Sequence, residues 1–487
     1  MSVDSDPSTL SRPARRMLMV LCCALFLDAL DVSMTGVALP SIRADLHMST
    51  SALQWIVSGY VLGYGGFLLL GGRAADVFGR RRVFLISLGV FVVASGLGGL
   101  ATGGGLLIAS RFIKGISAAF TAPAGLSIIT TRFAEGPARN KALTLYTATG
   151  ATGFSLGLVF SGLLTEIGWR WVFFFPVPLA LAALIAAVRL IPDSDARVRA
   201  AGGFDVIGAV TVTAAMLLLV FTVVEAPDAG WASVRTLGSF AGAAALLAAF
   251  TTIERRSAAP LVRLGILRSG SLVRANFGAM ALFGGWVGVL FVATLYMQQL
   301  RGWSALETGL AVFPAGVVVV ALMPRVAPLV QRFGVTPVIF TALLAHAAAY
   351  AVFLSIGLDS GYLAILLPTF LLVGLGFGLG FGPLNIAATN GIAAEEQGLA
   401  GGLVNTSFQF GGALVLAVVT AVNNAAAGPG DTPQAVLRGF HAAIVVSLIV
   451  ALLGAAVTAL GAVRRSAPTT VPAPAAAAGA APSDACA

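Results

Sequence analysis

The stretch FLDALDVSMTGVALP, residues 26–40, places two aspartates inside a run of apolar residues. The run begins near Met17 and ends near Leu39. About 20 such residues are enough to cross the ~30 Å hydrocarbon core of a bilayer. A charged side chain at the bilayer centre costs about 2.5–3.5 kcal/mol on insertion scales, so it usually faces a cavity or another charge. Asp28 and Asp31 therefore require partners elsewhere in the chain.

The composition of the chain is that of a polytopic membrane protein. Of its 487 residues 58% are hydrophobic and only 10% are charged, and the mean hydropathy is +0.95. A soluble domain is about one quarter charged, which excludes a large soluble helical protein. The net charge is +9, but the basic residues form short clusters between apolar runs. That distribution is typical of membrane topology and not of a nucleic-acid-binding surface.

Fourteen apolar runs are long enough to be transmembrane helices. They lie near 17–39, 52–71, 83–101, 106–129, 142–165, 171–191, 206–224, 236–253, 274–298, 306–329, 337–357, 362–385, 401–423 and 439–463. An even number of crossings places both termini on one side of the membrane.

The basic residues indicate which side that is. The loops and ends on the side of the termini carry 22 Lys and Arg residues, and the opposite loops carry five. Basic loops stay in the cytoplasm, so both termini are expected there. The Ala/Gly/Arg-rich, lysine-poor usage is typical of a GC-rich bacterial genome, which predicts the cytoplasmic membrane of a bacterium. We expect residues 1–16 and the Ala/Pro-rich residues 464–487 to be disordered cytoplasmic tails.

The sequence contains an internal repeat. SALQW begins at Ser51 and SALET at Ser304, while GRAADVFGRRRV begins at Gly72 and APLVQRFGVTPV at Ala327. The last two segments share Phe-Gly and a final Val at equal spacing. Internal repeats are typical of secondary transporters. The repeat predicts an all-α membrane protein with a six-helix half over 17–191, an insert of two helices within 192–253, and a second six-helix half over 254–463.

The repeated segment and the opening stretch resemble the major facilitator superfamily, in particular its fourteen-helix drug:proton antiporter branch. GRAADVFGRRR resembles the superfamily's loop motif G-x-L-A-D-R-x-G-R-K-R, with matches at Gly72, Asp76, Gly79, Arg80 and Arg82. LDVSMTGVALP resembles the branch's motif in the first helix. SRFIKGISAA resembles R-x-x-Q-G in the fourth helix, with Lys114 in place of glutamine.

This resemblance implies the major facilitator fold and export of small amphipathic, drug-like molecules in exchange for protons by alternating access. It also implies that Asp76 and Arg80 act in a gate, and that Asp31 is the helix-1 carboxylate of the branch. The partners that follow are a small-molecule substrate, protons and the lipid bilayer, with no nucleic acid. We expect a monomer that uses the proton gradient and holds no cofactor or metal.

The fifth helix departs from the antiporter pattern G-x-x-x-G-P-x-x-G-G. The segment GFSLGLVFSG keeps Gly153, Gly157 and Gly162, but Leu158 replaces the proline and Ser161 a glycine. That proline motif is associated with exporters, so a proton-coupled uptake system or metabolite permease of the same fold stays open. A membrane sensor or membrane-embedded enzyme would need an appended domain, whereas the longest loops have about 20 residues. No Walker, HExxH or cysteine/histidine pattern indicates an enzyme.

The two aspartates have candidate partners in the fourth predicted span. Asp28 and Asp31 lie three residues apart and share one helical face, as do Arg111 and Lys114. At a rise of 1.5 Å per residue, Asp31 lies about 9 Å and Asp28 about 13 Å below the outer boundary, against about 8 Å and about 12 Å for Arg111 and Lys114. We expect Asp31 near Arg111 and Asp28 near Lys114. The cluster is either a proton-coupling site or a static ion pair between two helices.

Several further side chains are candidates for the substrate cavity. They are aromatic or amide groups on predicted spans: Trp55, Tyr60, Tyr146, Phe154, Gln298, Asn405 and Gln409. Amides in membrane helices also serve as bonds between helices, and aromatic residues as packing or interface anchors. Both interpretations stay open for this set.

The arginine distribution makes a topology prediction. A reporter enzyme fused after Arg465 should be active in the cytoplasm, because the final basic pair follows the last apolar run. A reporter inserted near Asp228, between the seventh and eighth runs, should be exposed outside the cell. Reversed compartments for the two fusions would exclude the fourteen-span topology.

Overall fold

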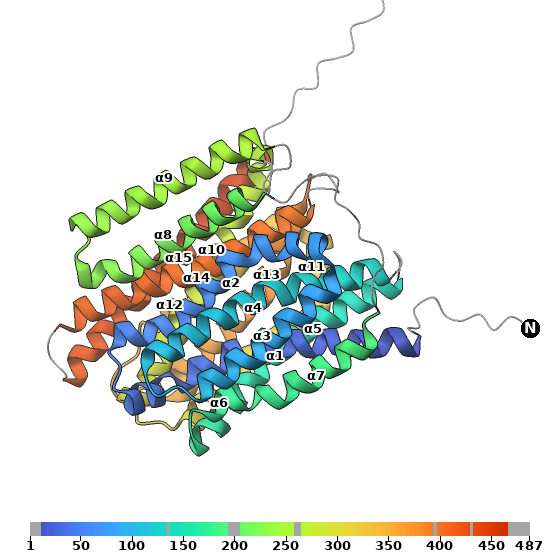
Figure 1. The fold of residues 1–487 in the computed structure, drawn as a ribbon. Coiled ribbons are helices and arrows are strands. Elements are labelled where there is room, and N and C mark those ends of the chain that lie inside the picture. Colours follow the sequence, from blue (N-terminus) through green and yellow to red (C-terminus); the bar gives the residue numbers. More distant parts are fainter. Residues whose placement is uncertain are drawn as a thin grey trace, which may run out of the picture.

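The chain forms one bundle of long helices that run roughly side by side (Figure 1). The computed structural model describes residues 11–133, 137–192, 205–257, 264–392, 397–428 and 432–465. Within those ranges the regular secondary structure is entirely helical. This agrees with the expected all-α membrane protein.

The helices follow the predicted spans closely. The first group is α1 (Arg12–Leu46), α2 (Thr50–Phe78), α3 (Arg80–Gly99), α4 (Gly104–Arg132), α5 (Pro137–Ile167), the short α6 (Trp171–Phe174) and α7 (Pro176–Leu190). Then come α8 (Val206–Ala229) and α9 (Val234–Arg256). The last group is η1 (Leu264–Arg268), α10 (Gly270–Leu295), η2 (Tyr296–Leu300), α11 (Ala305–Phe333), α12 (Val335–Phe353), η3 (Tyr362–Leu366), α13 (Leu367–Thr389), α14 (Gln397–Ala427) and α15 (Pro433–Arg465).

Each of the fourteen predicted runs coincides with one long helix, α6 and α7 together forming the sixth. Twelve helical segments within the described residues are long and apolar enough to cross a membrane. Of the other two helices, α8 contributes a shorter apolar stretch, Ile207–Val223, and α2 contains several side chains outside the described set.

The repeated Phe-Gly dipeptide marks the same turn in both groups of helices. Gly79 precedes α3 with a φ of +94°, and Gly334 precedes α12 with a φ of +83°. Residues with a side chain avoid this part of backbone space, whereas glycine enters it freely. The sequence repeat is therefore a repeat of a tight turn between successive helices.

The two groups of helices also share one pattern of neighbours. In the first group α1 packs against α5 and α7, and α4 packs against α2 and α3. In the last group α10 packs against α14 and α15, and α13 packs against α11 and α12. Two related halves would produce this correspondence; the exact boundaries 17–191, 192–253 and 254–463 stay a prediction.

Two helix pairs, α5 with α11 and α2 with α14, form most of the contact between the two groups. Glycines bring these helices together: a Cβ added at Gly309 of α11 would lie 2.3 Å from the carbonyl oxygen of Leu158 in α5. A Cβ added at Gly65 of α2 would lie 3.1 Å from Cβ of Gln409 in α14. The inserted helix α8 packs on α9 and against α2 and α14, so the insert covers the α2–α14 seam at the edge of the bundle (Figure 1).

The hydrophobic core is continuous at one end of the bundle and divided at the other. Where α1 ends and α2 begins, one cluster joins residues of both groups, among them Leu30, Leu158, Trp286 and Ala315. We call this the joined end. Toward the opposite end, the divided end, the first group has a cluster of its own and the last group has another, with members such as Leu21 and Phe84 in the first and Leu282, Leu384 and Val404 in the second.

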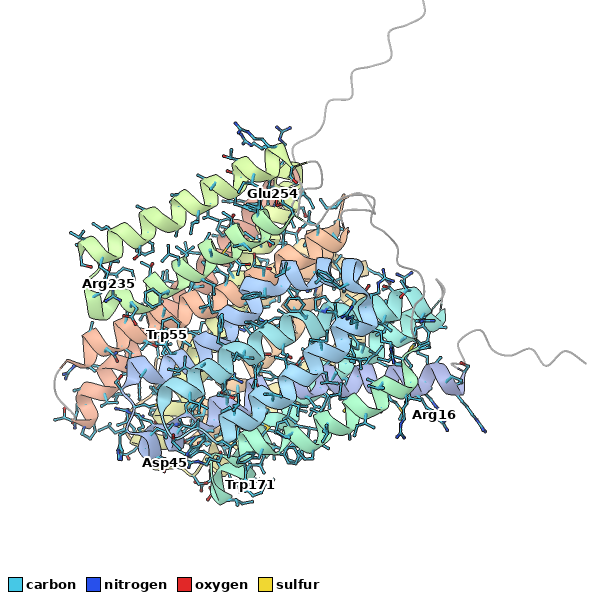
Figure 2. All side chains as sticks on the ribbon, in the orientation of Figure 1. Arg16, Asp45, Trp55, Trp171, Arg235 and Glu254 are labelled. Atoms are coloured by element: carbon cyan, nitrogen blue, oxygen red, sulfur yellow. The ribbon has the colours of Figure 1, made fainter. Side chains whose placement is uncertain are left out.

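The chain alternates between the two ends as the predicted topology requires. Figure 2 shows Arg16 and Glu254 at one end of the bundle and Asp45, Trp171 and Arg235 at the opposite end. Arg16 lies in the first turns of α1 and Asp45 in its last turn, so Asp45 marks the joined end. The divided end is therefore the end that the predicted topology places in the cytoplasm.

Candidate functional site

A cluster of buried charges lies between α1 and α4. Asp31 on α1 forms ion pairs with both Arg111 and Lys114 of α4, one carboxylate oxygen to each cation. Asp31 and Lys114 are 0% exposed and Arg111 is 1% exposed. The contact of Asp31 with Arg111 is the one that the matching depths predicted. One carboxylate therefore neutralises one of two buried cations, and the three groups together carry a formal charge of +1.

Other helices supply the remaining polar and aromatic contacts of these cations. Arg111 Nε donates to the carbonyl oxygen of Ile56 at 3.2 Å, and the guanidinium lies 4.5 Å from the ring centre of Tyr60. Lys114 Nζ donates to Ser95 Oγ at 3.0 Å and lies 4.8 Å from the ring centre of Phe91. Because buried charges require such partners, the cluster ties α1 and α4 to α2 and α3.

The sequence predicts Asp28 near Lys114, and the two groups lie close enough to interact electrostatically, but they form no ion pair among the described residues. Lys114 instead reaches Asp31, and within the described residues the buried Oδ2 atom of Asp28 has no hydrogen-bond partner. Depth along a helix axis does not fix where a flexible lysine side chain ends. Lys114 reaches the carboxylate that also contacts Arg111, which concentrates the opposite charges at one point.

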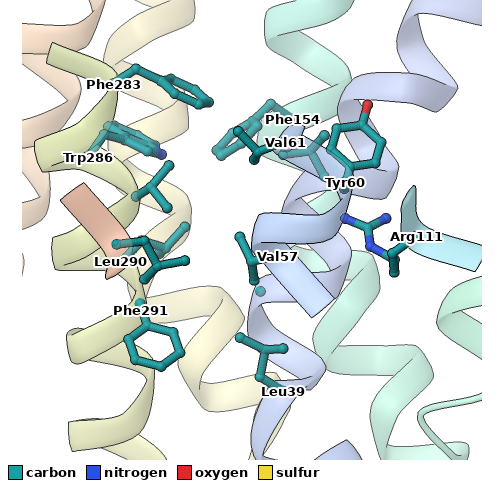
Figure 3. Close-up of a pocket in the computed structure, with 14 residues that line it drawn as sticks. Leu39, Val57, Tyr60, Val61, Arg111, Phe154, Phe283, Trp286, Leu290 and Phe291 are labelled. Atoms are coloured by element: carbon teal, nitrogen blue, oxygen red, sulfur yellow. The ribbon is translucent and has the colours of Figure 1, made fainter. Parts of the chain in front are cut away.

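A cavity lies beside this cluster, between the first and last groups of helices (Figure 3). The space not filled by atoms there, including the part open to solvent, is about 570 Å³. Its lining residues are Val32, Gly36, Leu39, Val57, Tyr60, Val61, Arg111, Phe154, Phe283, Trp286, Val287, Leu290, Phe291 and Leu416. Arg111 is the one charged residue in that lining. In the described part of the chain no three His, Cys, Asp or Glu side chains come together as metal ligands. The cavity, with one charged residue in an otherwise largely apolar lining, is the candidate ligand site.

Only two of the predicted cavity residues line this cavity. Tyr60 and Phe154 do so, from α2 and α5. Trp55 instead lies against Phe221 of α8, with 5.8 Å between the ring centres. Tyr146 is buried, and its hydroxyl donates to the carbonyl oxygen of Ala122 in α4 at 3.2 Å. These two aromatic residues make packing contacts between helices.

The predicted amides are also engaged with helices. Gln298 Nε2 donates to the carbonyl oxygen of Val37 at 3.0 Å, a bond from the last group of helices to α1. Asn405 Nδ2 donates to the carbonyl oxygen of Gly401 in its own helix at 2.8 Å. Gln409 packs against Gly65 across the α2–α14 seam. None of the three is among the residues that line the cavity.

One wall of the cavity was not predicted from the sequence. It comes from α10 and presents Phe283, Trp286 and Phe291, which face Tyr60 and Phe154 across the space (Figure 3). The Trp286 ring centre lies 5.6 Å from that of Phe154. The internal repeat could have indicated this wall. Within the last group α10 has the same pattern of neighbouring helices that α1 has within the first group, so both helices are expected to face the space between the groups.

The fifth-helix glycines hold α5 between α1 and α11. A Cβ added at Gly153 would lie 2.5 Å from the carbonyl oxygen of Phe26, and one at Gly157 would lie 2.7 Å from that of Leu30. A Cβ added at Gly162 would lie 2.5 Å from Cα of Leu306 in α11. Such close approach is possible only without a side chain. These glycines therefore act in helix packing.

The loop motif lies at the turn between α2 and α3. Gly72 and Asp76 fall in α2, in positions whose side-chain placement is outside the described set. Gly79 forms the turn itself, and α3 begins at Arg80 with Arg82 exposed in its first turn. The neighbouring Arg81 donates from Nη2 to the carbonyl oxygen of Val188 in α7 at 2.8 Å. The motif is thus placed at a turn of the divided end, and its gate role stays a prediction.

Comparison with known sequences identifies one protein family. The family model described as "Major Facilitator Superfamily" matches residues 21–416 of this chain. The cephamycin export protein CmcT of Amycolatopsis lactamdurans is 37% identical over 459 residues, which cover 93% of this chain and 94% of the relative. The puromycin resistance protein pur8 of Streptomyces alboniger is 36% identical over 455 residues, 90% and 89% of the two chains. The lincomycin resistance protein of Streptomyces lincolnensis is 31% identical over 419 residues, 86% of each.

Solved structures share the fold at low sequence identity. The nucleoside transporter NupG superposes with a TM-score of 0.66 at 12% identity, over 91% of this chain and 99% of that one. A bacterial homologue of the human lysosomal transporter Spinster, in an inward-facing and unoccupied conformation, superposes with a TM-score of 0.63 at 15% identity, over 93% and 97%. At these identities the likeness shows the fold alone.

The unequal contacts of the two aspartates predict unequal effects on stability. Asp31→Asn should lower the free energy of unfolding by about 3–5 kcal/mol, because it leaves two buried cations without their carboxylate. Asp28→Asn should change it by less than about 1 kcal/mol, since within the described residues Asp28 forms no ion pair. Thermal unfolding of the two isosteric variants in detergent would measure the difference. Equal losses would contradict the assigned pairing.

Proposed function

Because the chain belongs to the Major Facilitator Superfamily, we propose that it exports small amphipathic, antibiotic-like molecules across the cytoplasmic membrane of a bacterium in exchange for protons. Relatives that share 31–37% of their residues with it over most of its length are named for antibiotic export or resistance. The observation that carries the proposal is Arg111, which belongs both to the buried charge cluster and to the cavity wall. A change of charge in the cluster would therefore alter the electrostatic environment of the cavity in which a substrate would bind.

Alternating access would use the two ends of the bundle in turn. The joined end has a core shared by both groups of helices, and the divided end has two separate cores. This supports a state that opens toward the side of the termini, the cytoplasm in the predicted topology. Rocking of the two groups about the α5–α11 and α2–α14 contacts would join the divided end and open the other, as repeat-built transporters do.

Asp31 is the proposed site of proton coupling. A proton that binds its carboxylate removes the negative charge and leaves the two cations without a counter-charge in a dry interior. An uncompensated buried charge costs several kcal/mol, which is enough to shift the balance between two conformations. Protonation of Asp31 would then favour the conformation in which water or a substrate reaches Arg111 and Lys114.

The same cavity and cluster would also serve an uptake system or metabolite permease. The names of the relatives favour export over these alternatives. We further propose that both termini lie in the cytoplasm and that a monomer is the transporting unit, since the cavity is formed within one chain.

A charge-conserving variant tests the coupling role. Asp31→Asn combined with Arg111→Gln removes one charge of each sign, so the protein should regain most of the stability that Asp31→Asn loses. Substrate-driven proton movement should still be abolished, because no titrating group remains at Asp31. Reconstituted vesicles with an internal pH dye, tested with cephamycin, puromycin and lincomycin among other antibiotics, would give the readout.

Asp28→Asn is the matched control, because it removes a carboxylate one helical turn away without breaking an ion pair of the described cluster. It should keep proton movement. Normal proton coupling in the Asp31→Asn, Arg111→Gln protein would refute the coupling role and leave the cluster as a static staple between helices. Failure of the wild-type protein to move any tested compound outward would count against export itself.

The gate role of the loop motif has its own test. Asp76→Asn should leave the amount of protein in the membrane unchanged, because Asp76 is proposed to act in a gate and not in the core. It should reduce transport by about 5- to 150-fold, the factor to which typical coupling energies of about 1–3 kcal/mol correspond. Asp45→Asn is the control, since Asp45 lies at the joined end, where its Oδ2 atom accepts from Trp169 Nε1 at 2.9 Å and pairs with Arg170 at 2.8 Å. Cellular resistance and vesicle transport would be compared at equal protein levels. Full activity of the Asp76 variant would remove the gate assignment.

A further inference from the structure

We propose that the cavity selects molecules with an aromatic or aliphatic body and an anionic oxygen group, a carboxylate or phenolate, in preference to amines. This inference rests on the proposed function, since it names the substrate class of the same cavity. It concerns the charge of the ligand, which neither the family nor the fold specifies.

The body of the ligand follows from the apolar walls. Twelve of the fourteen lining residues are neither charged nor hydroxyl-bearing, and they include Phe154, Phe283, Trp286 and Phe291. Aromatic rings offer large contact areas and favour stacked or edge-to-face neighbours. A ligand with a flat apolar body would therefore lie against the aromatic side chains of both walls, beside the edge-to-face pair of Phe154 and Trp286 (Figure 3).

The charge of the ligand follows from Arg111. Its Nη1 atom pairs with Asp31 and its Nε atom donates to Ile56, whereas Nη2 makes no hydrogen bond within the described residues. A guanidinium holds a carboxylate or phenolate with short, charge-assisted hydrogen bonds, which are about twice as strong as neutral ones. Arg111 thus has a donor left for a ligand after its structural contacts are made.

The surroundings of Arg111 strengthen the preference. Two cations share the carboxylate of Asp31, so this ion pair offsets the positive charge of Arg111 only in part. Asp31 faces the two cations, and neither Asp31 nor Asp28 is among the lining residues. An ammonium group in the cavity would lose its water, meet a like charge and find no acid in the described lining. Burial of such an unpaired charge is strongly unfavourable.

Three probes of one shape test the preference. They are naphthalene-2-carboxylate, its neutral amide and 2-(aminomethyl)naphthalene, whose charges at pH 7.5 are −1, 0 and +1. Calorimetry on the purified full-length protein in nanodiscs would measure the three dissociation constants. The carboxylate should bind about tenfold more tightly than the amide, and the amine should bind most weakly. Equal affinities, absence of binding by the carboxylate, or tightest binding by the amine would overturn the proposal.

Variants identify the source of the preference. In the Asp31→Asn, Arg111→Gln protein the carboxylate and the amide should bind within about twofold of each other. Trp286→Leu should weaken both probes several-fold and keep their ratio. Arg170→Gln removes a cation at the exposed joined end and should change nothing. A tenfold ratio that persists without Arg111 would overturn the assignment; if that variant does not fold, the order of the three probes on the wild-type protein decides.

The two proposals can fail separately, because binding is measured at equilibrium without a proton gradient. Outward transport in vesicles together with no preference for the carboxylate would refute the substrate class alone. A preference for the carboxylate in a protein that moves no compound outward would refute export alone.

Discussion

The insertion of a carboxylate between two cations in the dry interior of the helix bundle is the constraint on which the rest of this structure depends. Each of the three charges would cost several kcal/mol if it were buried alone. Asp31, Arg111 and Lys114 avoid that cost only if α1 and α4 keep their depth and orientation relative to each other. Ile56 and Ser95 then extend the same requirement to α2 and α3. A polar network thus determines how four apolar helices are placed.

The second constraint on the arrangement of the helices is the placement of glycines at the points where helices approach closely. In the bilayer, burial of apolar surface does not favour helix association over contact with lipid, so packing and polar contacts must hold the bundle together. The glycines of α5 bring its backbone against α1 on one side and α11 on the other. The joined core at one end and the divided cores at the other then give the molecule two inequivalent ends. Such a bundle can be open at only one end at a time if it rocks about the α5–α11 and α2–α14 contacts.

The charge cluster and the cavity share a single residue, Arg111. Through it, proton binding at Asp31 and ligand binding in the cavity would influence each other. Nη1 and Nε of Arg111 donate hydrogen bonds to the protein, whereas Nη2 makes none within the described residues and belongs to a side chain that lines the apolar cavity. Proton binding at Asp31 and ligand binding in the cavity would both change the surroundings of this guanidinium. The proposed coupling would require no chain of intermediate residues through the protein, because the two events would share one cation.

The sequence by itself determined the properties that depend on position along the chain. Apolar length predicted the fourteen helices, the Phe-Gly repeat marked equivalent turns, and matching depths placed Asp31 against Arg111. The topology that the arginine distribution indicates stays a prediction. Only the tertiary structure decided what depends on direction around a helix axis and on the reach of flexible side chains. It placed Lys114 on Asp31 instead of Asp28, turned Trp55 toward α8, and brought Trp286 to the cavity wall. The physical reason is that hydropathy and helical rise report depth in the membrane, whereas the azimuth of each side chain is set by the neighbouring helices.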